Sequence, residues 1–288
     1  MIFPVKQKIN SLIAAATLIG CTGGAIAQDF DNVKIKDTPL RGSVHMFKGA
    51  GGNIGVSAGE DGILIIDDQF APLAEKIAAA LKELGNDAPK YLVNTHFHGD
   101  HTGANVFFHD HKDSTIFAHE NVRVRLASDE KVAPGALPVV TFADGITIHF
   151  NNETLNVFHL EHGHTDGDSV VWFKEPNVMH TGDLFFNKRF PFIDLSSGGS
   201  VDGYVAAVKT LLGKIDDDTI IIPGHGPLAD KADYENFLAM IEETRSTVEK
   251  MKADGLTQEQ AIEKGLGSQW DSWSWNFIST EKWIKTLW

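Results

Sequence analysis

Residues 95–101 read Thr95-His96-Phe97-His98-Gly99-Asp100-His101 and place four side chains able to bind metal within six residues. The segment directly follows residues 91–94, an apolar run that predicts a short strand. On a helix, side chains with this spacing would point in different directions around the axis. On a turn after a strand they can converge, and Gly99 would let the backbone fold tightly between two ligands.

The donor chemistry of this segment indicates the kind of metal. Imidazole and carboxylate ligands suit zinc or iron(II), and the lack of Cys and Met argues against copper(I) and iron–sulfur clusters. A surface cluster of histidines without a metal is the alternative. The density of ligand types, and residues of the same kinds downstream, favour a metal site.

The rest of the chain alternates between strand and helix patterns. In the first half, residues 53–66 predict two strands joined by a Gly-Glu-Asp-Gly turn, residues 72–84 a helix, and a further helix begins near Thr102 or Gly103. Pro134 and Pro138 mark a loop between two halves. In the second half, strands are expected near 139–142, 146–150, 154–159, 169–173, 177–180 and 219–222, with helices near 202–213 and 229–252. This order predicts two layered halves with sheets face to face and helices outside.

The motifs of this chain resemble those of the metallo-β-lactamase superfamily. The segment HFHGDH resembles its HxHxDH signature, and Gly163-His164-Thr165 resembles its GHT element. Asp183 follows a strand pattern, and His225 follows the apolar run 220–222, as their counterparts do in that family. The resemblance spans roughly residues 42–250. It implies an α/β fold of the αββα type, two mixed sheets face to face with helices outside.

The resemblance also implies a site for two divalent metal ions, with zinc favoured and iron or manganese as alternatives. The first ion would be held by His96, His98 and His164. The second would be held by Asp100, His101 and His225, and Asp183 would bridge both. Such a pair shares a hydroxide whose parent water has a pKa of roughly 7, and this hydroxide would cleave an ester, lactone, thioester or lactam bond. Asp100 would also be catalytic, orienting the hydroxide and passing a proton to the leaving group.

Other polar residues have two interpretations. His162 competes with His164 as the ligand, and the Gly-His-Thr match favours His164. Asp67 after the strand pattern 63–66 is either an acceptor that supports a metal-bound His or an N-cap or turn residue. The remaining histidines are expected to be packed or supporting at strand ends (His159, His180) or to lie at the surface or in loops (His109, His111, His119).

The N-terminus predicts export. Residues 1–27 read as a secretory signal, with two lysines, an apolar stretch at 9–19 and a small-x-small site before Gln28. A competing lipoprotein cleavage site would place a lipid anchor on Cys21. The protein is therefore expected in the periplasm or outside the cell. The remaining chain is divided into a metallo-β-lactamase domain at 28–250 and a C-terminal helical extension at 251–288.

Composition narrows the partners to small molecules. The net charge is −14, and the predicted signal contains two lysines and no acids, so the mature chain carries −16. Such a surface repels phosphate backbones and disfavours nucleic acid. No apolar stretch of about 18 residues follows the N-terminal segment, so no membrane span is expected.

The ligand set separates the classes of hydrolase. β-Lactamases with a cysteine ligand need Cys where Asp183 stands, so only weak β-lactamase activity is expected. The full set resembles glyoxalase II-like thioesterases and acyl-homoserine lactonases. Export and a tail whose one arginine is Arg245 disfavour glutathione thioesters, and the negative charge disfavours ribonucleases. The rival is a persulfide dioxygenase-like oxidoreductase with a single iron.

The pocket walls are expected from loops near 68–71 and 187–200 and from the C-terminus. The phenylalanines near the second loop form either an apolar mouth or a packed hairpin: Phe185, Phe186, Phe190 and Phe192. The C-terminal tryptophans form either a binding platform or, more commonly, core packing: Trp270, Trp273, Trp275, Trp283 and Trp288. The glycine-rich residues 49–52 lack the Lys-Ser/Thr of a phosphate loop and predict a hairpin turn.

Overall fold

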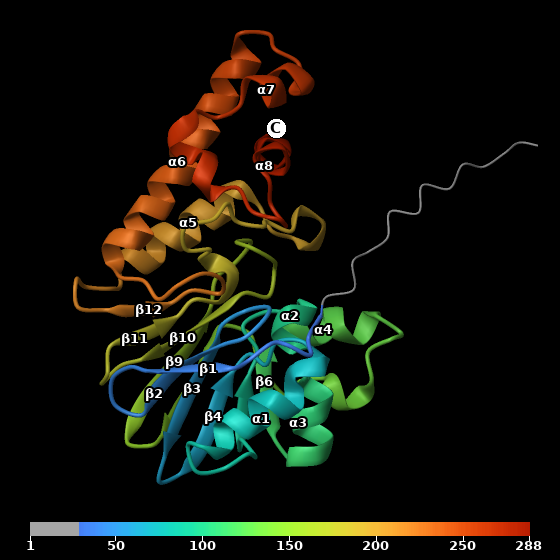
Figure 1. Cartoon of the computed structure of the whole chain (residues 1–288), viewed down its shortest axis with the longest axis vertical. Helices are drawn as coiled ribbons and strands as arrows, with labels where there is room; N and C mark the ends of the chain where they lie inside the picture. Colours follow the sequence, from blue (N-terminus) through green and yellow to red (C-terminus); the bar gives the residue numbers. More distant parts are fainter. Residues whose placement is uncertain (1–28) are drawn as a thin grey trace, which may run out of the picture.

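Two β-sheets packed face to face form the centre of the protein, as a computed structural model describes it for residues 29–288 (Figure 1). The expected signal peptide and Cys21 lie outside the described residues. Helices cover the outer faces of both sheets, so the layers run helix, sheet, sheet, helix. This is the αββα arrangement that the sequence predicts.

The first sheet has seven strands in sequential order and is mixed. Strands β1 to β4 pair antiparallel, and β4 to β7 pair parallel. The strands are β1 (Lys36–Pro39), β2 (Val44–Lys48), β3 (Ile54–Gly59), β4 (Gly62–Ile66), β5 (Tyr91–Val93), β6 (Thr115–His119) and β7 (Val140–Phe142). The turn between β2 and β3 contains residues 49–52, which confirms the predicted hairpin.

The second sheet has five strands in the order β12-β11-β10-β9-β8. It is also mixed, because β11 and β12 pair parallel and the other neighbours pair antiparallel. The strands are β8 (Gly145–Phe150), β9 (Glu153–His159), β10 (Ser169–Phe173), β11 (Val178–His180) and β12 (Ile220–Ile222). Each lies within about one residue of a predicted strand.

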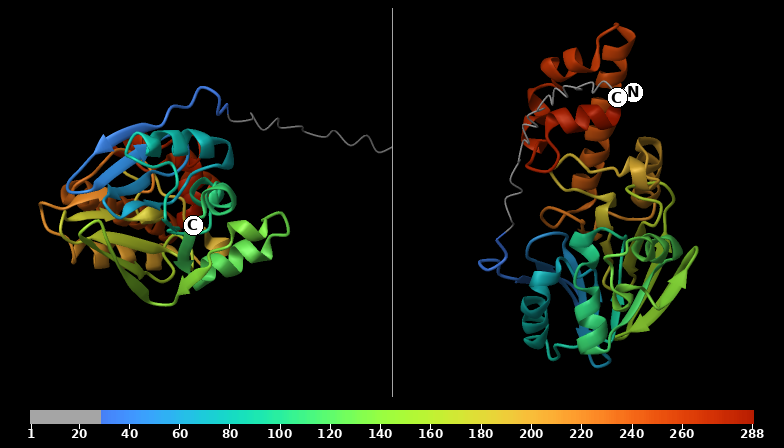
Figure 2. Two further views of the ribbon diagram at one scale, coloured as in Figure 1. Left: turned by 90° about the horizontal axis from the view of Figure 1, so that it is seen from below. Right: turned by 90° about the vertical axis from the view of Figure 1, so that its right-hand side faces the viewer.

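The helices form two outer layers (Figure 2). Helices α1 (Ala74–Lys82) and α3 (Asn105–Lys112) pack on the first sheet, and α5 (Val201–Leu212) and α6 (Lys231–Ala253) pack on the second. The other α-helices are α2 (Gly99–Thr102), α4 (Glu120–Ser128), α7 (Gln258–Lys264) and α8 (Thr280–Leu287). Short 3-10 turns are η1 (Ala71–Leu73), η2 (Pro134–Ala136), η3 (Gly182–Leu184), η4 (Leu195–Ser197) and η5 (Ser268–Trp273).

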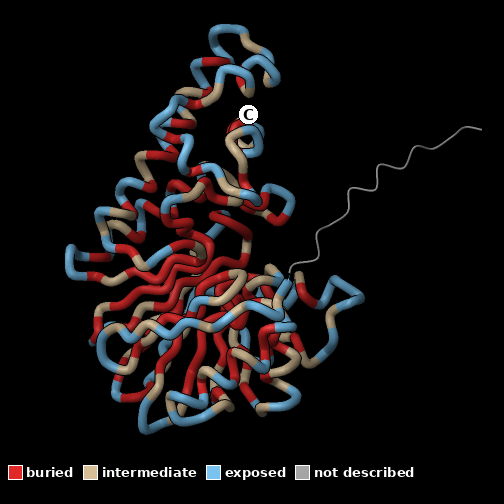
Figure 3. The backbone as a smooth tube through the Cα atoms, in the orientation of Figure 1, coloured by how far each residue is buried: buried red, intermediate tan, exposed pale blue. Residues whose placement is uncertain are grey.

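Buried apolar side chains fill three layers, and Figure 3 shows them concentrated in the strands. Between the sheets, Leu64 and Ile66 of β4 meet Val171 of β10 and Ile222 of β12. The alternate β4 residues, Ile63 and Ile65, face α1 and α3 instead. Strand β4 is therefore buried on both faces, as its short unbroken apolar run predicts. Burying each such side chain stabilises the fold by about 1.5–3 kcal/mol.

Some elements escape the sequence pattern. Strands β1, β2 and β6 and helix α4 are not predicted, because polar and charged residues interrupt their apolar positions. The segment of the HFHGDH motif also differs from the expected turn. Its first half is a loop, but Gly99 to Thr102 form the single helical turn α2, and Gly99 is not in a left-handed conformation.

The C-terminal residues pack into the same core as the second helical layer. Trp270, Trp273 and Trp283 are buried in one cluster with α5 and α6. Helix α6 ends at Ala253, and the division at residue 250 stays a prediction. No helix of residues 29–288 has the length and apolar character needed to cross a bilayer.

Candidate metal centre

Seven polar side chains meet at one end of the two sheets, beyond the carboxyl ends of four strands. His96 and His98 follow β5 in a loop, and Asp100 and His101 lie on α2. His164 follows β9, Asp183 lies in η3 after β11, and His225 follows β12. All seven are the residues that the sequence motifs single out. Both sheets therefore contribute to the site.

The seven residues form two groups with Asp183 between them. His96, His98, His164 and Asp183 offer ligand atoms within 4.8 Å of one another, and so do Asp100, His101 and His225. The Asp183 Oδ1 atom lies 3.1 Å from Nε2 of His101 and 3.4 Å from Nε2 of His225. Its Oδ2 lies 3.5 Å from Nε2 of His164 and 3.8 Å from Nε2 of His96. One carboxylate thus faces both groups.

Hydrogen bonds on the outer side of His98 and His164 fix their tautomers. Nε2 of His98 lies 3.1 Å from Oδ2 of Asp194, and Nδ1 of His164 lies 2.7 Å from the carbonyl of Phe192. Because both partners are acceptors, each imidazole donates from that nitrogen. The remaining nitrogens, Nδ1 of His98 and Nε2 of His164, face each other at 2.8 Å. In a metal-bound state both of these nitrogens would carry lone pairs directed at one point between them, where a cation fits.

His96 and His101 are oriented in the same way through Asp67. Asp67 Oδ2 accepts hydrogen bonds from Nδ1 of His101 at 2.7 Å and from Oγ1 of Thr95 at 2.8 Å. Since the Thr95 hydroxyl donates to Asp67, it accepts from Nδ1 of His96 at 3.0 Å. Nε2 of His96 then has no hydrogen-bond partner among the described residues, although it is buried. An orphaned inward nitrogen of this kind fits a metal ligand.

Charges divide between the two groups. Burial lowers the pKa of His96 well below its usual value and that of His164 to about 4, so both rings are neutral, as metal ligands must be. Burial also opposes a charge on His225, but Asp183 and Asp100 raise its pKa to about 9. The imidazoles of His101 and His225 hold the pKa of Asp183 well below its usual range. Asp100 and Asp183 thus favour positive charge beside His101 and His225, and a divalent cation would supply it.

Asp100 combines contact with the cluster and access to solvent. Its Oδ2 lies 3.3 Å from Nε2 of His225 and 3.7 Å from Nε2 of His101. Although burial opposes ionisation, His101 and His225 lower its pKa, so it is a carboxylate at neutral pH. A quarter of its side chain is exposed, against 4% for Asp183. Asp100 is thus the carboxylate of the cluster that faces the pocket most openly.

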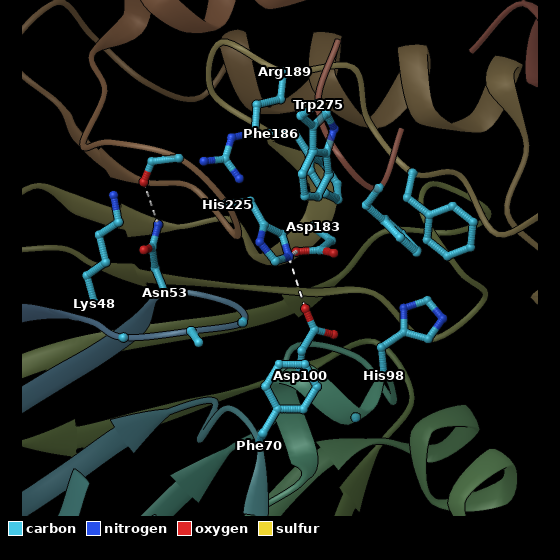
Figure 4. A pocket seen from close by; sticks show the side chains of 17 residues that line it. Lys48, Asn53, Phe70, His98, Asp100, Asp183, Phe186, Arg189, His225 and Trp275 are labelled. Atoms are coloured by element: carbon cyan, nitrogen blue, oxygen red, sulfur yellow. Dashed lines mark hydrogen bonds and ion pairs between the residues drawn. The ribbon is translucent and has the colours of Figure 1, made fainter. Parts of the chain in front are cut away.

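A cavity of about 600 Å³ opens above the cluster (Figure 4). Asp100, Asp183, His98 and His225 lie at its base. Its apolar walls are Phe70, Phe186, Phe192, Trp275 and Phe277. The three predicted wall segments therefore contribute, and the β2–β3 turn at 48–53 adds a fourth wall that the sequence did not indicate.

The phenylalanines at 185–192 and the C-terminal tryptophans are divided between the core and the cavity wall, whereas the sequence left these two roles as alternatives. Phe185 and Phe190 are buried in the core, whereas Phe186 and Phe192 line the cavity. Trp275 is the only one of the five C-terminal tryptophans, all within the described residues, that lines the cavity. The other four pack around α6 and α8. Phe186 stacks on the imidazole of His225 with ring centroids 4.9 Å apart.

The other histidines lie mostly where expected. His162 is exposed and outside the cluster, while His164 is inside it. His180 is buried and donates to the Asn53 carbonyl. His119 is a correction, because it is buried, caps α4 and stacks on His159 with centroids 3.8 Å apart. Asp67 supports His101, and the N-cap interpretation is wrong.

Several supporting residues escape sequence reasoning. Asp194 and Asn53 carry no motif, yet Asp194 orients His98 and Asn53 donates to the Pro223 carbonyl beside His225. Asp168 accepts hydrogen bonds from the His164 amide and the Thr165 side chain, and burial raises its pKa to about 7. The contacts of Asp194 and Asn53 join segments that lie far apart in the chain. Those of Asp168 lie within a turn that has no distinctive sequence pattern.

Comparison with known proteins assigns the family. The profile described as the metallo-beta-lactamase superfamily matches residues 49–225. The chain is 29% identical over 180 residues to the probable metallo-hydrolase YqgX of Bacillus subtilis, covering 58% of this chain and 84% of the relative. It is 28% identical over 163 residues to the hydroxyacylglutathione hydrolase GloC of Haemophilus influenzae, covering 53% and 76%. A metallo-beta-lactamase from Pontibacter korlensis has the same fold, with a TM-score of 0.62 and 19% identity over 73% of this chain and 99% of that one.

Proposed function

The chain belongs to the metallo-beta-lactamase superfamily of hydrolases, and we propose that it cleaves an ester, lactone, thioester or lactam bond with two divalent metal ions, most readily zinc. The observation that carries this proposal is the position of Asp183, whose two oxygens face two separate sets of donors. A site for one metal needs no such shared carboxylate.

The donor set fits this cofactor. We assign the first ion to His96, His98, His164 and Asp183. The three imidazoles offer inward nitrogens, and Asp183 offers one carboxylate oxygen. We assign the second to Asp100, His101, His225 and the other oxygen of Asp183. When bound, such a pair polarises the scissile carbonyl and lowers the pKa of a water to roughly 7, so the protein itself need supply no nucleophile.

Asp100 has the position required for proton transfer. Its carboxylate is ionised, borders the cavity and lies within 3.3 Å of His225. It can accept a proton from the attacking water and deliver it to the leaving group. The aromatic walls would exclude bulk water from the acyl part of the substrate and favour apolar acyl or lactone groups.

Two measurements on purified protein test the proposal. Metal analysis is expected to give about two zinc ions per chain, whereas about one iron would support the oxidoreductase instead. The metal-loaded protein is then assayed on a panel of esters, lactones, thioesters and β-lactams. Failure to take up any transition metal, or failure to hydrolyse any member of the panel, contradicts the proposal.

Asp100→Asn tests the catalytic carboxylate. We expect the variant to retain the fold and to lose about 10²- to 10⁴-fold in kcat, the usual contribution of a general acid or base. Asp110→Asn, an exposed carboxylate on α3, is the matched control. Full turnover by metal-replete Asp100→Asn would show that this role is wrong.

We also propose that the protein is exported, on the evidence of residues 1–27 and the competing lipid site at Cys21. Fractionation of cells expressing the full chain tests this proposal, because an exported protein is released with the periplasmic contents or the membrane fraction. Mass spectrometry of the N-terminus then separates cleavage after Ala27 from lipidation of Cys21.

A further inference from the structure

A buried tyrosine outside the metal cluster holds the main chain of Asp183. Tyr204 lies on α5, is fully buried, and donates a hydrogen bond from its hydroxyl to the Asp183 carbonyl at 2.7 Å. The carbonyl can only accept, so the phenol is the donor. A buried carbonyl that loses its donor either stays unsatisfied, which costs free energy, or turns toward another partner. The Tyr204 hydroxyl therefore fixes the peptide group that follows the shared carboxylate.

The first turn of α5 is also tied to the loop that carries His164. The Ser200 amide donates to the carbonyls of residues 162–163 at 3.1 and 3.2 Å. Tyr204 follows one helical turn later, and its amide donates to the Ser200 carbonyl at 2.8 Å. One end of this helix thus contacts two segments of the cluster, the His164 loop and the main chain of Asp183.

The carboxylate of Asp183 has little room to compensate for a shift of its backbone. Its side chain is 4% exposed, and Gly224 packs so closely against it that a Cβ at this glycine would overlap Oδ1 of Asp183. Oδ1 lies 3.1 Å from Nε2 of His101, and Oδ2 lies 3.5 Å from Nε2 of His164. Metal–ligand distances tolerate deviations of only about 0.2 Å. A small movement toward one group therefore withdraws the carboxylate from the other.

A second tyrosine makes the same kind of contact one residue further along the chain. Tyr234 lies on the neighbouring helix α6 (Figure 1), is fully buried, and donates from its hydroxyl to the Leu184 carbonyl at 3.1 Å. Both tyrosine rings pack against Phe237, with centroids 6.0 and 6.2 Å away. The two hydroxyls thus share one environment, but only that of Tyr204 reaches a residue of the metal cluster.

We propose, on the basis of the two-metal site proposed above, that Tyr204 is a positioning residue that keeps the Asp183 carboxylate between the two groups of metal ligands. Helix α5 supplies the frame, since its first turn is tied to the His164 loop and its tyrosine to Asp183. Loss of the hydroxyl lets the carboxylate move toward His101, whose Nε2 is nearer than that of His164. The ion assigned to the group of His164 then loses a ligand.

Metal titration of the purified protein tests the inference. Competition for zinc with a chromogenic chelator gives the dissociation constants of both ions in the wild type, in Tyr204→Phe and in Tyr234→Phe. We expect Tyr204→Phe to bind one of the two ions 10- to 100-fold more weakly, the usual effect of losing a partner that orients a ligand. Tyr234→Phe is the matched control and is expected to retain both constants.

Stability measurements separate positioning from general loosening of the core. Each variant leaves one buried carbonyl without its donor, so denaturant unfolding of the chelated protein is expected to show similar losses for both. A purely structural role would then change the metal affinity of Tyr204→Phe and Tyr234→Phe alike. The positioning role predicts equal stability and unequal metal affinity.

Manganese(II) gives a spectroscopic readout of the shared carboxylate. Two manganese ions joined by a bridging ligand are magnetically coupled, and their electron paramagnetic resonance spectrum differs from the hyperfine pattern of separate ions. At saturating manganese, we expect the coupled signal in the wild type and in Tyr234→Phe. Tyr204→Phe is expected to show the pattern of separate ions in a larger share of the signal.

Ser200→Ala provides a second test that holds even if Tyr204→Phe does not fold. It removes the cap of α5, where the Ser200 hydroxyl accepts from the Gly203 amide at 3.0 Å. We expect it to weaken one zinc ion by a smaller factor than Tyr204→Phe. Ser279→Ala removes the equivalent cap of α8 and is the control. Equal zinc affinities in the two serine variants would contradict the role of α5 as a frame.

The outcomes separate this inference from the hydrolase proposal. Unchanged zinc affinity in Tyr204→Phe, or equal losses in Tyr204→Phe and Tyr234→Phe, overturns the role of Tyr204 and leaves the two-metal hydrolase standing. A wild-type protein that binds fewer than two ions overturns the two-metal site and the inference together. A protein that binds two ions, loses one selectively in Tyr204→Phe and hydrolyses no member of the panel supports the positioning role and overturns the hydrolase proposal instead.

Discussion

Asp194 accepts a hydrogen bond from Nε2 of His98 at 3.1 Å, and this contact turns Nδ1 of His98 toward His164. The other oxygen of Asp194 accepts from the amide and hydroxyl of Ser196. Burial opposes the charge of Asp194, but hydrogen bonds from Ser196, Ser197 and His98 lower its pKa to about 2. The carboxylate is thus fixed as an acceptor on both sides.

Replacing this carboxylate is expected to weaken metal binding. In Asp194→Asn the amide group must face either Ser196 or His98, and both are donors. We expect a 10- to 100-fold lower affinity for the first metal ion, the usual effect of losing an outer partner of a ligand. Competition with a chromogenic chelator measures it. Asp202→Asn, an exposed surface acid, serves as control, and equal affinities in the two variants would refute the role.

Asp67→Asn is expected to lower the affinity for the second metal ion and the free energy of unfolding. Asn tolerates the left-handed backbone of Asp67, where φ is 64°, so the change acts through hydrogen bonds to Thr95 and His101 alone. A buried donor left unsatisfied costs about 1–3 kcal/mol in the free energy of unfolding. Denaturant unfolding and metal titration measure the two effects.

The neighbouring Asp68 provides a control of the same chemistry. Burial raises the pKa of Asp68 well above its usual value, and one of its oxygens has no partner among the described residues. Asp68→Asn is therefore expected to change stability and metal affinity little. A loss equal to that of Asp67→Asn would show that both residues act through local packing.

Gly52→Ala is expected to disturb His101. A Cβ at this position would overlap the imidazole ring of His101, and Gly52 has no positive φ that would confuse the result. We expect reduced metal content measured by emission spectroscopy. Gly99→Ala is the counterpart within the metal motif, because a Cβ there meets no atom within 4 Å. It should retain its metal, and the reverse ranking would contradict this account.

Metal removal is expected to lower thermal stability. Metal at about 100 times its dissociation constant adds about 2.7 kcal/mol, which corresponds to about 5–10 °C for a domain of this size. The shift between chelated and zinc-loaded protein should shrink in His164→Asn, which loses a ligand of the first ion, and persist in full in His162→Asn. Both positions carry histidine two residues apart, but only His164 lies in the cluster. An identical Tm with and without metal would argue against a metal-stabilised site.

The sequence anticipates what depends on local pattern. The cluster His96, His98, Asp100 and His101 was recognisable from its density after an apolar strand pattern, and the downstream ligands from the resemblance of their motifs to those of the superfamily. Strand β6 and helix α4 were missed because Thr115, Arg123 and Arg125 interrupt the apolar periodicity. Tertiary burial of Ile116 and Val122 decides these elements instead.

Long-range partners could not be predicted from pattern at all. Asp194 and His98 are 96 residues apart, and an Asp before two serines reads simply as a turn. The glycines at 51 and 52 were expected only to turn a hairpin. In the structure that hairpin also borders the cavity, and Gly52 leaves room for the His101 ring, which no spacing rule reveals.

The aromatic wall supplied by Trp275 and Phe277 comes from a different part of the chain than the metal ligands at the base of the cavity. Both lie about fifty residues beyond the segment shared with the superfamily, which ends at residue 225. Trp273 and Trp283 anchor this tail in the core, so its cavity-facing side chains can be exchanged without loosening the anchor. Part of the cavity wall thus comes from a stretch that the superfamily profile does not cover, and a different tail could change which molecules fit while the metal ligands stay the same.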